Sequence, residues 1–238
     1  MQTIKVNKKN VKIIAHRGLS GIELENTISA FVAAGNRSYF GIETDIHVTT
    51  DGKFVVIHDE TTERVSDENI NVEEVTYDEV RNVQLRSKYG EGRIDLKIPN
   101  LQEYIDICKI YEKKCILEFK NVFSEEDIKK VLNKINEMNY FENVIFISFK
   151  LDNLKILRKL LPEKELQYLC KKYDEEVMDN LNKYNLDLDI DHKNLTKEIV
   201  DKVHSNNHLV NCWTVDDKER AEELVAWGVD FITTNIIE

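Results

Sequence analysis

Two acidic residues and two histidines lie close together in the stretch from Gly41 to Asp59, which reads GIETDIHVTTDGKFVVIHD. Because side chains alternate along a strand with a period of two, Glu43, Asp45 and His47 are expected to share one face. Carboxylates offer the hard oxygen ligands that Mg²⁺ and Ca²⁺ prefer, and imidazoles titrate near neutral pH. With His58 nearby, this stretch could bind a cation and move protons.

The turn signal Thr50-Asp51-Gly52 separates two runs rich in isoleucine, valine and threonine, and predicts an antiparallel hairpin. Folding back at this turn places His58 opposite residues near Thr44, at the level of the two acids. An exposed polar face on a sheet is the alternative interpretation. The apolar residues that alternate with the acids argue against it, because a strand buried on both sides leaves unpaired carboxylates at a high free-energy cost, which a divalent cation relieves.

Apolar periodicity predicts strands and helices in alternation along the chain. The expected strands are at 12–15, around Glu43 and Asp45, and at 115–120, 144–149, 166–170, 186–190, 209–215 and 230–233. The intervening helices are expected from Asn26 or Thr27 to Gly35, and at 101–108, 124–135, 151–161, 174–184, 196–206 and 216–227. Eight parallel strands with interleaved helices form a (β/α)8 TIM barrel. An open doubly wound sheet is the alternative, but no glycine-rich dinucleotide turn follows any strand.

We expect residues 1–238 to form a single TIM-barrel catalytic domain, because 42% of them are hydrophobic and the length suits one barrel. Residues 60–98 are polar and acidic, with one helix near 76–85, and are expected to be a small insertion on the barrel face. The formal net charge of -11 argues against nucleic acid as the main partner and against docking on an anionic membrane.

Localisation is predicted from the cysteines and from the lack of targeting signals. The four cysteines lie in apolar runs without metal-ligand spacing, so buried free thiols in a reducing compartment are expected. No stretch approaches the ~20 apolar residues of a membrane span, and the N-terminal residues lack a signal-peptide core. These features predict a cytoplasmic protein.

The active site of such a barrel lies at the C-terminal ends of its strands. Those ends carry three carboxylates, two cations and two histidines, namely Glu43, Asp45 and Glu118, Arg17 and Lys120, and His16 and His58. The carboxylates suit Mg²⁺ or Ca²⁺, the cations suit a phosphate, and the histidines can act as base and acid. This inventory predicts metal-assisted cleavage of a phosphodiester.

The ordered motifs also resemble those of the glycerophosphodiester phosphodiesterase family. The matching motifs, which span nearly the whole chain, are His16-Arg17-Gly18, Glu25-Asn26-Thr27, Glu43-x-Asp45, the Thr50-Asp51-Gly52 turn, His58-Asp59, Ile98-Pro99-x-Leu101, Glu118-x-Lys120, Ser148-Phe149, Trp213-Thr214-Val215 and Gly228-Val229-Asp230. No single triplet is specific, but the ordered set is. The resemblance implies an α/β barrel with a small insertion, a divalent cation, and hydrolysis of glycerophosphodiesters to glycerol 3-phosphate and an alcohol.

The resemblance also implies a role for each matching residue. Glu43, Asp45 and Glu118 would bind the metal, His16 and His58 would form the acid-base pair, and Arg17 and Lys120 would hold the phosphate. Two other residues have two interpretations each, and a third has one. Trp213 is either a core aromatic or a wall for the glycerol, Glu25 is either structural or close to the metal, and Asn26 is interpreted in part as a helix cap. His204 and His208 are expected at the surface.

Departures from the family pattern are few: His47, the segment Glu60-Thr61-Thr62-Glu63-Arg64, and Asn235 where an aspartate is common. We expect them to affect head-group preference more than chemistry. The head group, the choice of metal, the order in which the histidines act and the oligomeric state, a homodimer included, are left open by the sequence.

Three alternative functions are weighed against a diesterase acting on a small glycerophosphodiester. A lysophospholipid-cleaving variant would need an apolar rim at the barrel mouth, and none is visible in residues 60–98. A phosphoinositide-cleaving phospholipase type can act without the metal carboxylates, all of which are present here. A non-enzymatic phosphate-ester binding module would be expected to lose a histidine or a ligand, and none is lost.

Overall fold

The computed structural model describes residues 2–87 and 93–238. In this part of the chain the strands form one sheet in the order β1-β9-β8-β7-β6-β5-β4-β2-β3, and β1 also pairs with β2. The strands are β1 (Lys12–Ala15), β2 (Gly41–Val48), β3 (Phe54–Val56), β4 (Lys114–Phe119), β5 (Val144–Ser148), β6 (Leu166–Cys170), β7 (Asp187–Asp191), β8 (Val210–Trp213) and β9 (Phe231–Thr234). The β1–β2 pairing closes the sheet into a barrel.

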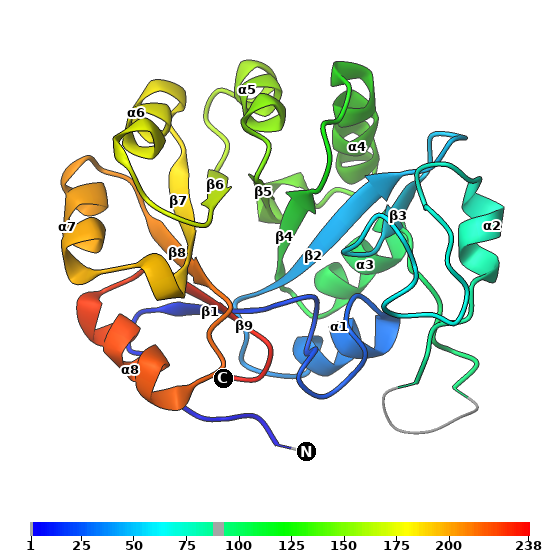
Figure 1. The fold of residues 1–238 in the computed structure, drawn as a ribbon, viewed down its shortest axis with the longest axis horizontal. Helices are drawn as coiled ribbons and strands as arrows, with labels where there is room; N and C mark the ends of the chain where they lie inside the picture. Colours follow the sequence, from blue (N-terminus) through cyan, green and yellow to red (C-terminus); the bar gives the residue numbers. More distant parts are fainter. Residues whose placement is uncertain (1, 88–92) are drawn as a thin grey trace.

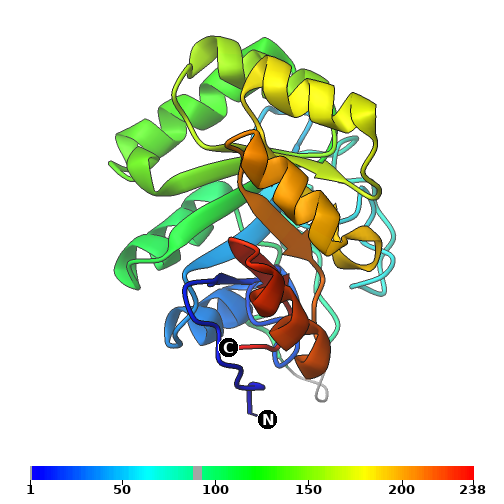
Figure 2. The same cartoon turned by 90° about the vertical axis from the view of Figure 1, so that its left-hand side faces the viewer.

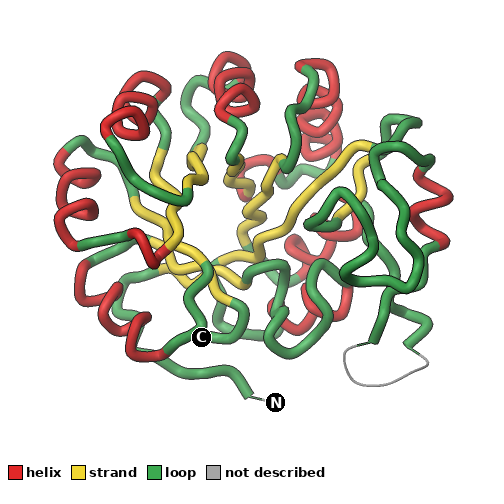
Figure 3. The backbone as a smooth tube through the Cα atoms, viewed as in Figure 1, coloured by secondary structure: helices red, strands yellow, loops and turns green. Residues whose placement is uncertain are grey.

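All pairings within the closed barrel are parallel, and β3 is the antiparallel return arm of β2. The helices are α1 (Ile28–Gly35), α2 (Tyr77–Asn82), α3 (Leu101–Ile110), α4 (Glu125–Glu137), α5 (Leu151–Leu160), α6 (Glu175–Tyr184), α7 (Lys197–Ser205) and α8 (Lys218–Trp227), with 3-10 turns at Phe141–Asn143 and His192–Asn194. Helices surround the strands in every view (Figures 1, 2 and 3). The predicted (β/α)8 barrel and its hairpin are therefore confirmed, and no described helix is long and apolar enough to span a membrane.

Helix starts follow from side chains that accept the first free backbone N–H groups. Asn100 caps α3 and exchanges hydrogen bonds with Glu103 in a capping box, as the sequence predicted. Thr27, and not Asn26, caps α1. The interpretation of Asn26 as a cap is therefore wrong, because its backbone is left-handed, with φ of 52°, and its amide is used inside the barrel instead.

Some predicted boundaries were a few residues too long. The helix expected near 76–85 ends at Asn82, because Val83 has extended backbone angles, with φ of -58° and ψ of 126°. The strand expected at 209–215 is limited to Val210–Trp213. Neither difference changes the order of the elements.

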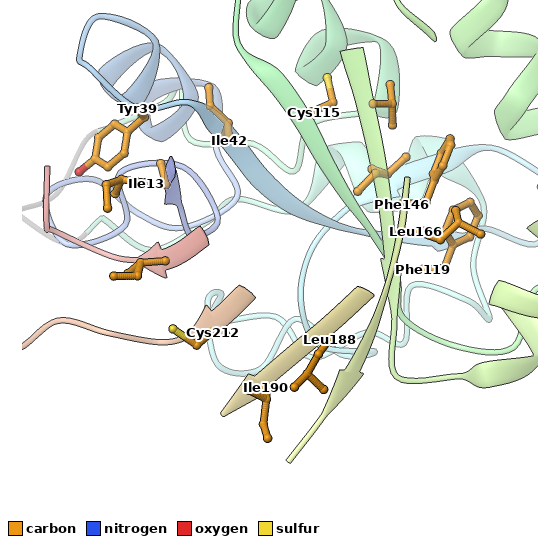
Figure 4. Close-up of a cluster of buried hydrophobic side chains, with 14 of the residues drawn as sticks. Ile13, Tyr39, Ile42, Cys115, Phe119, Phe146, Leu166, Leu188, Ile190 and Cys212 are labelled. Atoms are coloured by element: carbon orange, nitrogen blue, oxygen red, sulfur yellow. The ribbon is translucent and has the colours of Figure 1, made fainter. Parts of the chain in front are cut away.

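Strand residues alternate between two apolar layers. One set packs outward against the helices, and Figure 4 shows Ile42, Phe146 and Ile190 in this layer. The other set, which includes Ile116 and Phe231, fills the barrel interior. Glu43 and Asp45 alternate with outward-facing Ile42 and Ile46, so the same pleat directs both carboxylates into the barrel.

The segment between β3 and α3 carries a small core of its own, although its sequence reads as polar. Its apolar residues are isolated along the chain but gather on β3, in a cluster of Val55, Ile57, Val65, Val72, Val80, Val83, Leu85, Leu96 and Ile98. Figure 1 shows α2 and its loops beside β3. Residues 88–92 of the expected insertion lie outside the described residues.

Candidate active site

Three buried carboxylates converge at the C-terminal ends of β2 and β4. Asp45 and Glu118 are register partners on these neighbouring strands, and Glu43 precedes Asp45 on the same face. Each of the three offers an oxygen within 4.8 Å of the others. Because they lie on parallel strands that are hydrogen-bonded to each other, their spacing is set by the backbone.

The pKa values of the three acids show the effects of burial and of repulsion between their negative charges. Burial and then the charge of Asp45 raise the pKa of Glu43 well above its usual value, and the same two causes raise that of Glu118 to about 8. Burial acts in the same direction on Asp45, but the Lys120 ammonium and the Arg17 guanidinium hold its pKa below the usual range. Three adjacent carboxylates are therefore not all ionised together without further positive charge.

The donor set fits a divalent cation. Oδ1 of Asp45 and Oε1 of Glu118 are buried and accept no hydrogen bond of good geometry from the described residues. Lys120 approaches both as an ion pair, with Nζ at 3.3 Å from the Asp45 oxygen and 2.9 Å from the Glu118 oxygen. Free lone pairs on clustered carboxylates are what Mg²⁺ and Ca²⁺ require.

Arg17 is held from several sides. Its backbone, left-handed with φ of 53°, turns its N–H to Oε2 of Glu43 at 2.8 Å. Its Nη1 donates to Oε1 of Glu25 at 2.8 Å, while Nε lies 3.6 Å from Oδ2 of Asp45. Glu25 therefore orients the guanidinium and lies outside the carboxylate cluster, which supports the structural interpretation of this residue.

Asn26 connects the loop after β1 to the acids. Its Nδ2 donates to Oδ2 of Asp45 at 2.8 Å, and its Oδ1 accepts a hydrogen bond from the Thr44 hydroxyl at 2.7 Å. The amide therefore occupies one lone pair of Asp45 and leaves Oδ1 of that carboxylate open. Sequence reasoning missed this role, because a polar residue before a helix is more simply explained as a cap.

His16 has a defined tautomer. Nδ2 of Asn235 donates to Oδ2 of Asp216 at 2.6 Å, so Oδ1 of Asn235 faces the histidine and accepts from its Nδ1 at 2.8 Å. The proton on Nδ1 leaves Nε2 as the acceptor. Burial and then the charge of Arg17 lower the pKa of His16 to about 4, so the ring is neutral near pH 7.

His58 is paired with a carboxylate instead of an amide. Its Nδ1 lies 2.6 Å from Oδ1 of Asp59, and Oδ2 of Asp59 accepts from Nε of Arg64 at 2.6 Å. Arg64 also donates to both carboxylate oxygens of Glu25, each at 2.8 Å. Burial lowers the pKa of His58, and the charge of Asp45 acts in the opposite direction. Arg64 thus connects the partner of His58 to the partner of Arg17.

These groups face one cavity of about 330 Å³ at the barrel mouth. Its lining includes seven of the predicted site residues, namely His16, Arg17, Glu43, His58, Glu118, Lys120 and Trp213. Asp45, the eighth, is fully buried beside them. A larger hollow of about 540 Å³ lies between the hairpin turn, α3 and α4, and its lining includes none of the eight.

Of three other histidines, two have surroundings that the sequence did not suggest. His47 was expected to share the face of the acids, but its Nδ1 is bonded to Glu73 at 2.8 Å and it does not line the cavity. His204 and His208 were expected to be solvated. His208 is instead buried and bonded to Asn182. His204 keeps 35% of its side chain exposed, in line with a surface position, and also pairs with Asp230. Each has a structural partner from another element, which local sequence does not reveal.

Comparisons with known proteins find one family along nearly the whole chain. A family model described as the Glycerophosphoryl diester phosphodiesterase family matches residues 16–238. A glycerophosphodiester phosphodiesterase of Caldanaerobacter subterraneus subsp. tengcongensis is 33% identical over 227 residues, which cover 94% of this chain and 93% of that relative.

Two solved structures extend the comparison. A glycerophosphodiester phosphodiesterase from Parabacteroides distasonis superposes with a TM-score of 0.77 at 29% identity, covering 95% of this chain and 93% of the other. An Oleispira antarctica phosphodiesterase, solved in complex with the product sn-glycerol-3-phosphate, shares the fold with a TM-score of 0.83 at 21% identity, covering 97% and 95%.

Proposed function

The chain belongs to the glycerophosphoryl diester phosphodiesterase family, and on this premise we propose how it hydrolyses glycerophosphodiesters to glycerol 3-phosphate and an alcohol. The observation that carries the proposal is one cavity that brings together two imidazoles, two cations and a cluster of three buried carboxylates. Residues 1–238 act as one catalytic domain, with residues 60–98 as a small insertion on the barrel face. The four free, buried cysteines support a cytoplasmic location.

Glu43, Asp45 and Glu118 hold one divalent cation, Mg²⁺ or Ca²⁺. The unsatisfied oxygens of Asp45 and Glu118 and the raised pKa values of Glu43 and Glu118 support this assignment. When bound, the cation supplies positive charge that stabilises the phosphate oxygens as the bond to the leaving group breaks.

Arg17 and Lys120 hold the phosphate beside the acids. Glu25 and the backbone contact to Glu43 position Arg17, so its guanidinium is oriented before substrate arrives. Nε of Arg17 is buried and has no hydrogen-bond partner among the described residues, which leaves a donor for an anionic oxygen. Lys120, already between Asp45 and Glu118, adds a second positive charge at the same place.

His16 and His58 move the two protons of the reaction. In each ring Nδ1 is engaged, by Asn235 or by Asp59, so Nε2 is the atom available to the substrate. One imidazole removes the proton of the attacking hydroxyl, and the other protonates the leaving alkoxide. Among the described residues, no serine or cysteine lines the cavity, so neither residue type offers a nucleophile there.

The nucleophile is then the 2-hydroxyl of the glycerol, which lies next to the phosphorus. Its attack forms a cyclic phosphate and releases the alcohol, and water opens the cyclic ester to glycerol 3-phosphate. Two groups held in one molecule gain effective concentration, which favours this route over direct attack by water.

Release of glycerol 3-phosphate from a panel of glycerophosphodiesters tests the function. His16→Ala and His58→Ala should each lower kcat at least about a hundredfold with unchanged circular dichroism. His204→Ala, whose ring pairs with Asp230 away from the cavity, is the matched control and should retain full activity. Activity on lysophospholipids or phosphoinositides alone, or binding without turnover, would replace this function by one of the alternatives.

A further inference from the structure

Two buried polar atoms in the catalytic cavity have no hydrogen-bond partner among the described residues and no role in the steps above. They are Oδ1 of Asp189 on β7 and Nε1 of Trp213 on β8. Both residues line the cavity, and β7 and β8 are neighbouring parallel strands. Among the described residues, neither atom has a hydrogen-bond partner. A buried polar atom left unpaired costs free energy, so such atoms at a ligand cavity indicate a ligand that pairs with them.

The carboxyl group of Asp189 is held in place from the barrel interior. The residue is 1% exposed, and its Oδ2 accepts from Nδ2 of Asn211 at 3.1 Å. Asn211 is itself fixed, because it donates to Gln167 at 3.0 Å and accepts from the Thr233 hydroxyl at 3.2 Å. This network occupies one carboxyl oxygen and leaves the other for the cavity.

No described cation pairs with Asp189 within ion-pair distance. Burial raises the pKa of this carboxyl group well above the usual value, which favours its protonated form. A neutral carboxyl group can both donate and accept a hydrogen bond. It therefore suits a neutral polar group better than it suits a cation.

The Trp213 ring is held edge to face against Phe149, with centroids 5.5 Å apart and planes at 79°. Its indole N–H can only donate. A ligand group shared by Trp213 and Asp189 must therefore accept one hydrogen bond and make a second one with a carboxyl group. A hydroxyl group does both.

We propose that Asp189 and Nε1 of Trp213 together bind the terminal hydroxyl of the glycerol moiety, and that this contact makes the enzyme selective for glycerol over diols that lack it. The inference rests on the proposed function, because it assigns the glycerol end of the same substrate. Asp189 is thus a specificity-determining residue that neither the motifs nor the resemblance identified.

The surroundings of Asp189 favour contact with the glycerol end of the substrate over contact with the alcohol head group. Ile147 and Leu169, from the apolar barrel interior, line the same cavity. The glycerol is the constant, compact part of the substrate, whereas the alcohol varies and must leave. An ammonium head group is further disfavoured by Arg17, Lys120 and Lys171, which all line the cavity.

The test compares two substrates that differ in one hydroxyl: glycerophosphocholine, and the propane-1,2-diol phosphocholine that keeps the hydroxyl next to phosphate but lacks the terminal one. The ratio of their kcat/KM values should favour the glycerol substrate by about ten- to a hundredfold in the wild type. Asp189→Ala should bring the ratio close to one, mainly by slowing the glycerol substrate. Trp213→Phe, which keeps an aromatic ring but removes the indole N–H, should lower the ratio in part.

Two further variants separate recognition from structure. Asp189→Asn keeps an acceptor and a donor and should retain much of the selectivity, which also covers the case in which Asp189→Ala does not fold. Asp191 lies on the same strand, but its side chain accepts a hydrogen bond from the Lys193 backbone and does not line the cavity. Asp191→Ala should therefore leave the ratio unchanged.

The outcomes distinguish this inference from the function on which it rests. If the wild type is active but Asp189→Ala and Trp213→Phe keep its ratio of kcat/KM values, the inference is overturned and the proposed function is not. A defect in Asp189→Ala confined to choline or ethanolamine esters, and absent for neutral head groups, would overturn it in favour of head-group binding. Wild type that releases no glycerol 3-phosphate from any ester would overturn both.

Discussion

Nδ1 of His16 donates a hydrogen bond to Oδ1 of Asn235, 2.8 Å away. The asparagine stands where the family commonly has an aspartate, and we expected this departure to affect head-group preference. Its hydrogen bond to His16 makes this departure relevant to the proposed acid-base chemistry as well. Burial and the charge of Arg17 lower the pKa of His16. A carboxylate beside Nδ1 would offset this lowering more strongly than the amide of Asn235 does.

Asn235→Asp should therefore move one limb of the pH-rate profile upward. A carboxylate beside Nδ1 stabilises the imidazolium, so the pKa of His16 rises from about 4, by about one to three units for a close opposite charge. The neutral ring then forms only at higher pH. The kcat/KM profile, together with an NMR titration of the ring, measures the shift.

The matched controls act on the neighbouring carboxylates. In the wild type, Asp216 accepts a hydrogen bond from the Asn235 amide, so in Asn235→Asp two carboxylates face each other. Adding Asp216→Asn supplies an amide donor to the new carboxylate. Asp59→Asn removes a group that raises the pKa of His58, so the limb that belongs to His58 should move to lower pH. An unchanged profile in Asn235→Asp would show that His16 does not titrate in the rate-limiting step.

Arg64→Met should lower kcat about tenfold with little loss of stability. Arg64 connects Asp59, the partner of His58, to Glu25, the partner of Arg17. Its loss leaves the His58 imidazole and the Arg17 guanidinium less well oriented, and such misplacement is costly for the rate. The stability effect is small, because its side chain is 47% exposed and exposed ion pairs contribute little. Steady-state kinetics and thermal melting measure the two effects.

Arg93→Met is the matched control for Arg64→Met. Arg93 lies in the same segment between β3 and α3 as Arg64. It pairs with Asp95 and Glu23, and among the described residues it forms no ion pair with Asp59. Its kcat should equal that of the wild type. Equal losses in the two variants would mean that charge on this face, and not the orientation of His58, explains the effect.

Affinity for the metal should increase with pH up to about pH 8. In the metal-free protein Glu43 and Glu118 have raised pKa values, about 8 for Glu118, so binding a cation must displace protons. The increase in Tm on adding Mg²⁺ should therefore be larger at about pH 8 than at about pH 6. Glu118→Gln should abolish most of this increase.

Chelation gives the corresponding activity result. A chelator should abolish turnover, and Mg²⁺ or Ca²⁺ should restore it. Full turnover after exhaustive chelation, or a Tm increase that does not depend on pH or on Glu118, would refute the assignment of the metal site.

Diesters that lack the 2-hydroxyl should be hydrolysed far more slowly than glycerophosphodiesters. The cyclic route needs that hydroxyl, because it is the group that attacks the phosphorus. A 2-deoxy analogue and bis(p-nitrophenyl) phosphate test the requirement, and the cyclic glycerol phosphate should itself be a substrate. Equal rates with and without the hydroxyl would leave water as the direct nucleophile, with the same residues in place.

The barrel and the carboxylate cluster could be predicted from the sequence because both depend on local periodicity. Alternation along β2 places Glu43 and Asp45 on one face, and the parallel order of strands brings Glu118 to the same end. The small core of residues 60–98 could not be predicted in this way, because its apolar residues are isolated in sequence and meet only on β3.

The partners of the catalytic side chains depend on the closed barrel. His16 and Asn235 are 219 positions apart and meet because β1 pairs with β9. His47 has the spacing of the acids but bonds Glu73 in the segment after β3, since the barrel no longer encloses β2 at that point. Asp189 and Trp213 lie on separate strands, and nothing in either strand's pattern relates one to the other. Sequence periodicity determines the face on which a side chain lies, whereas ring closure and register determine what it meets there.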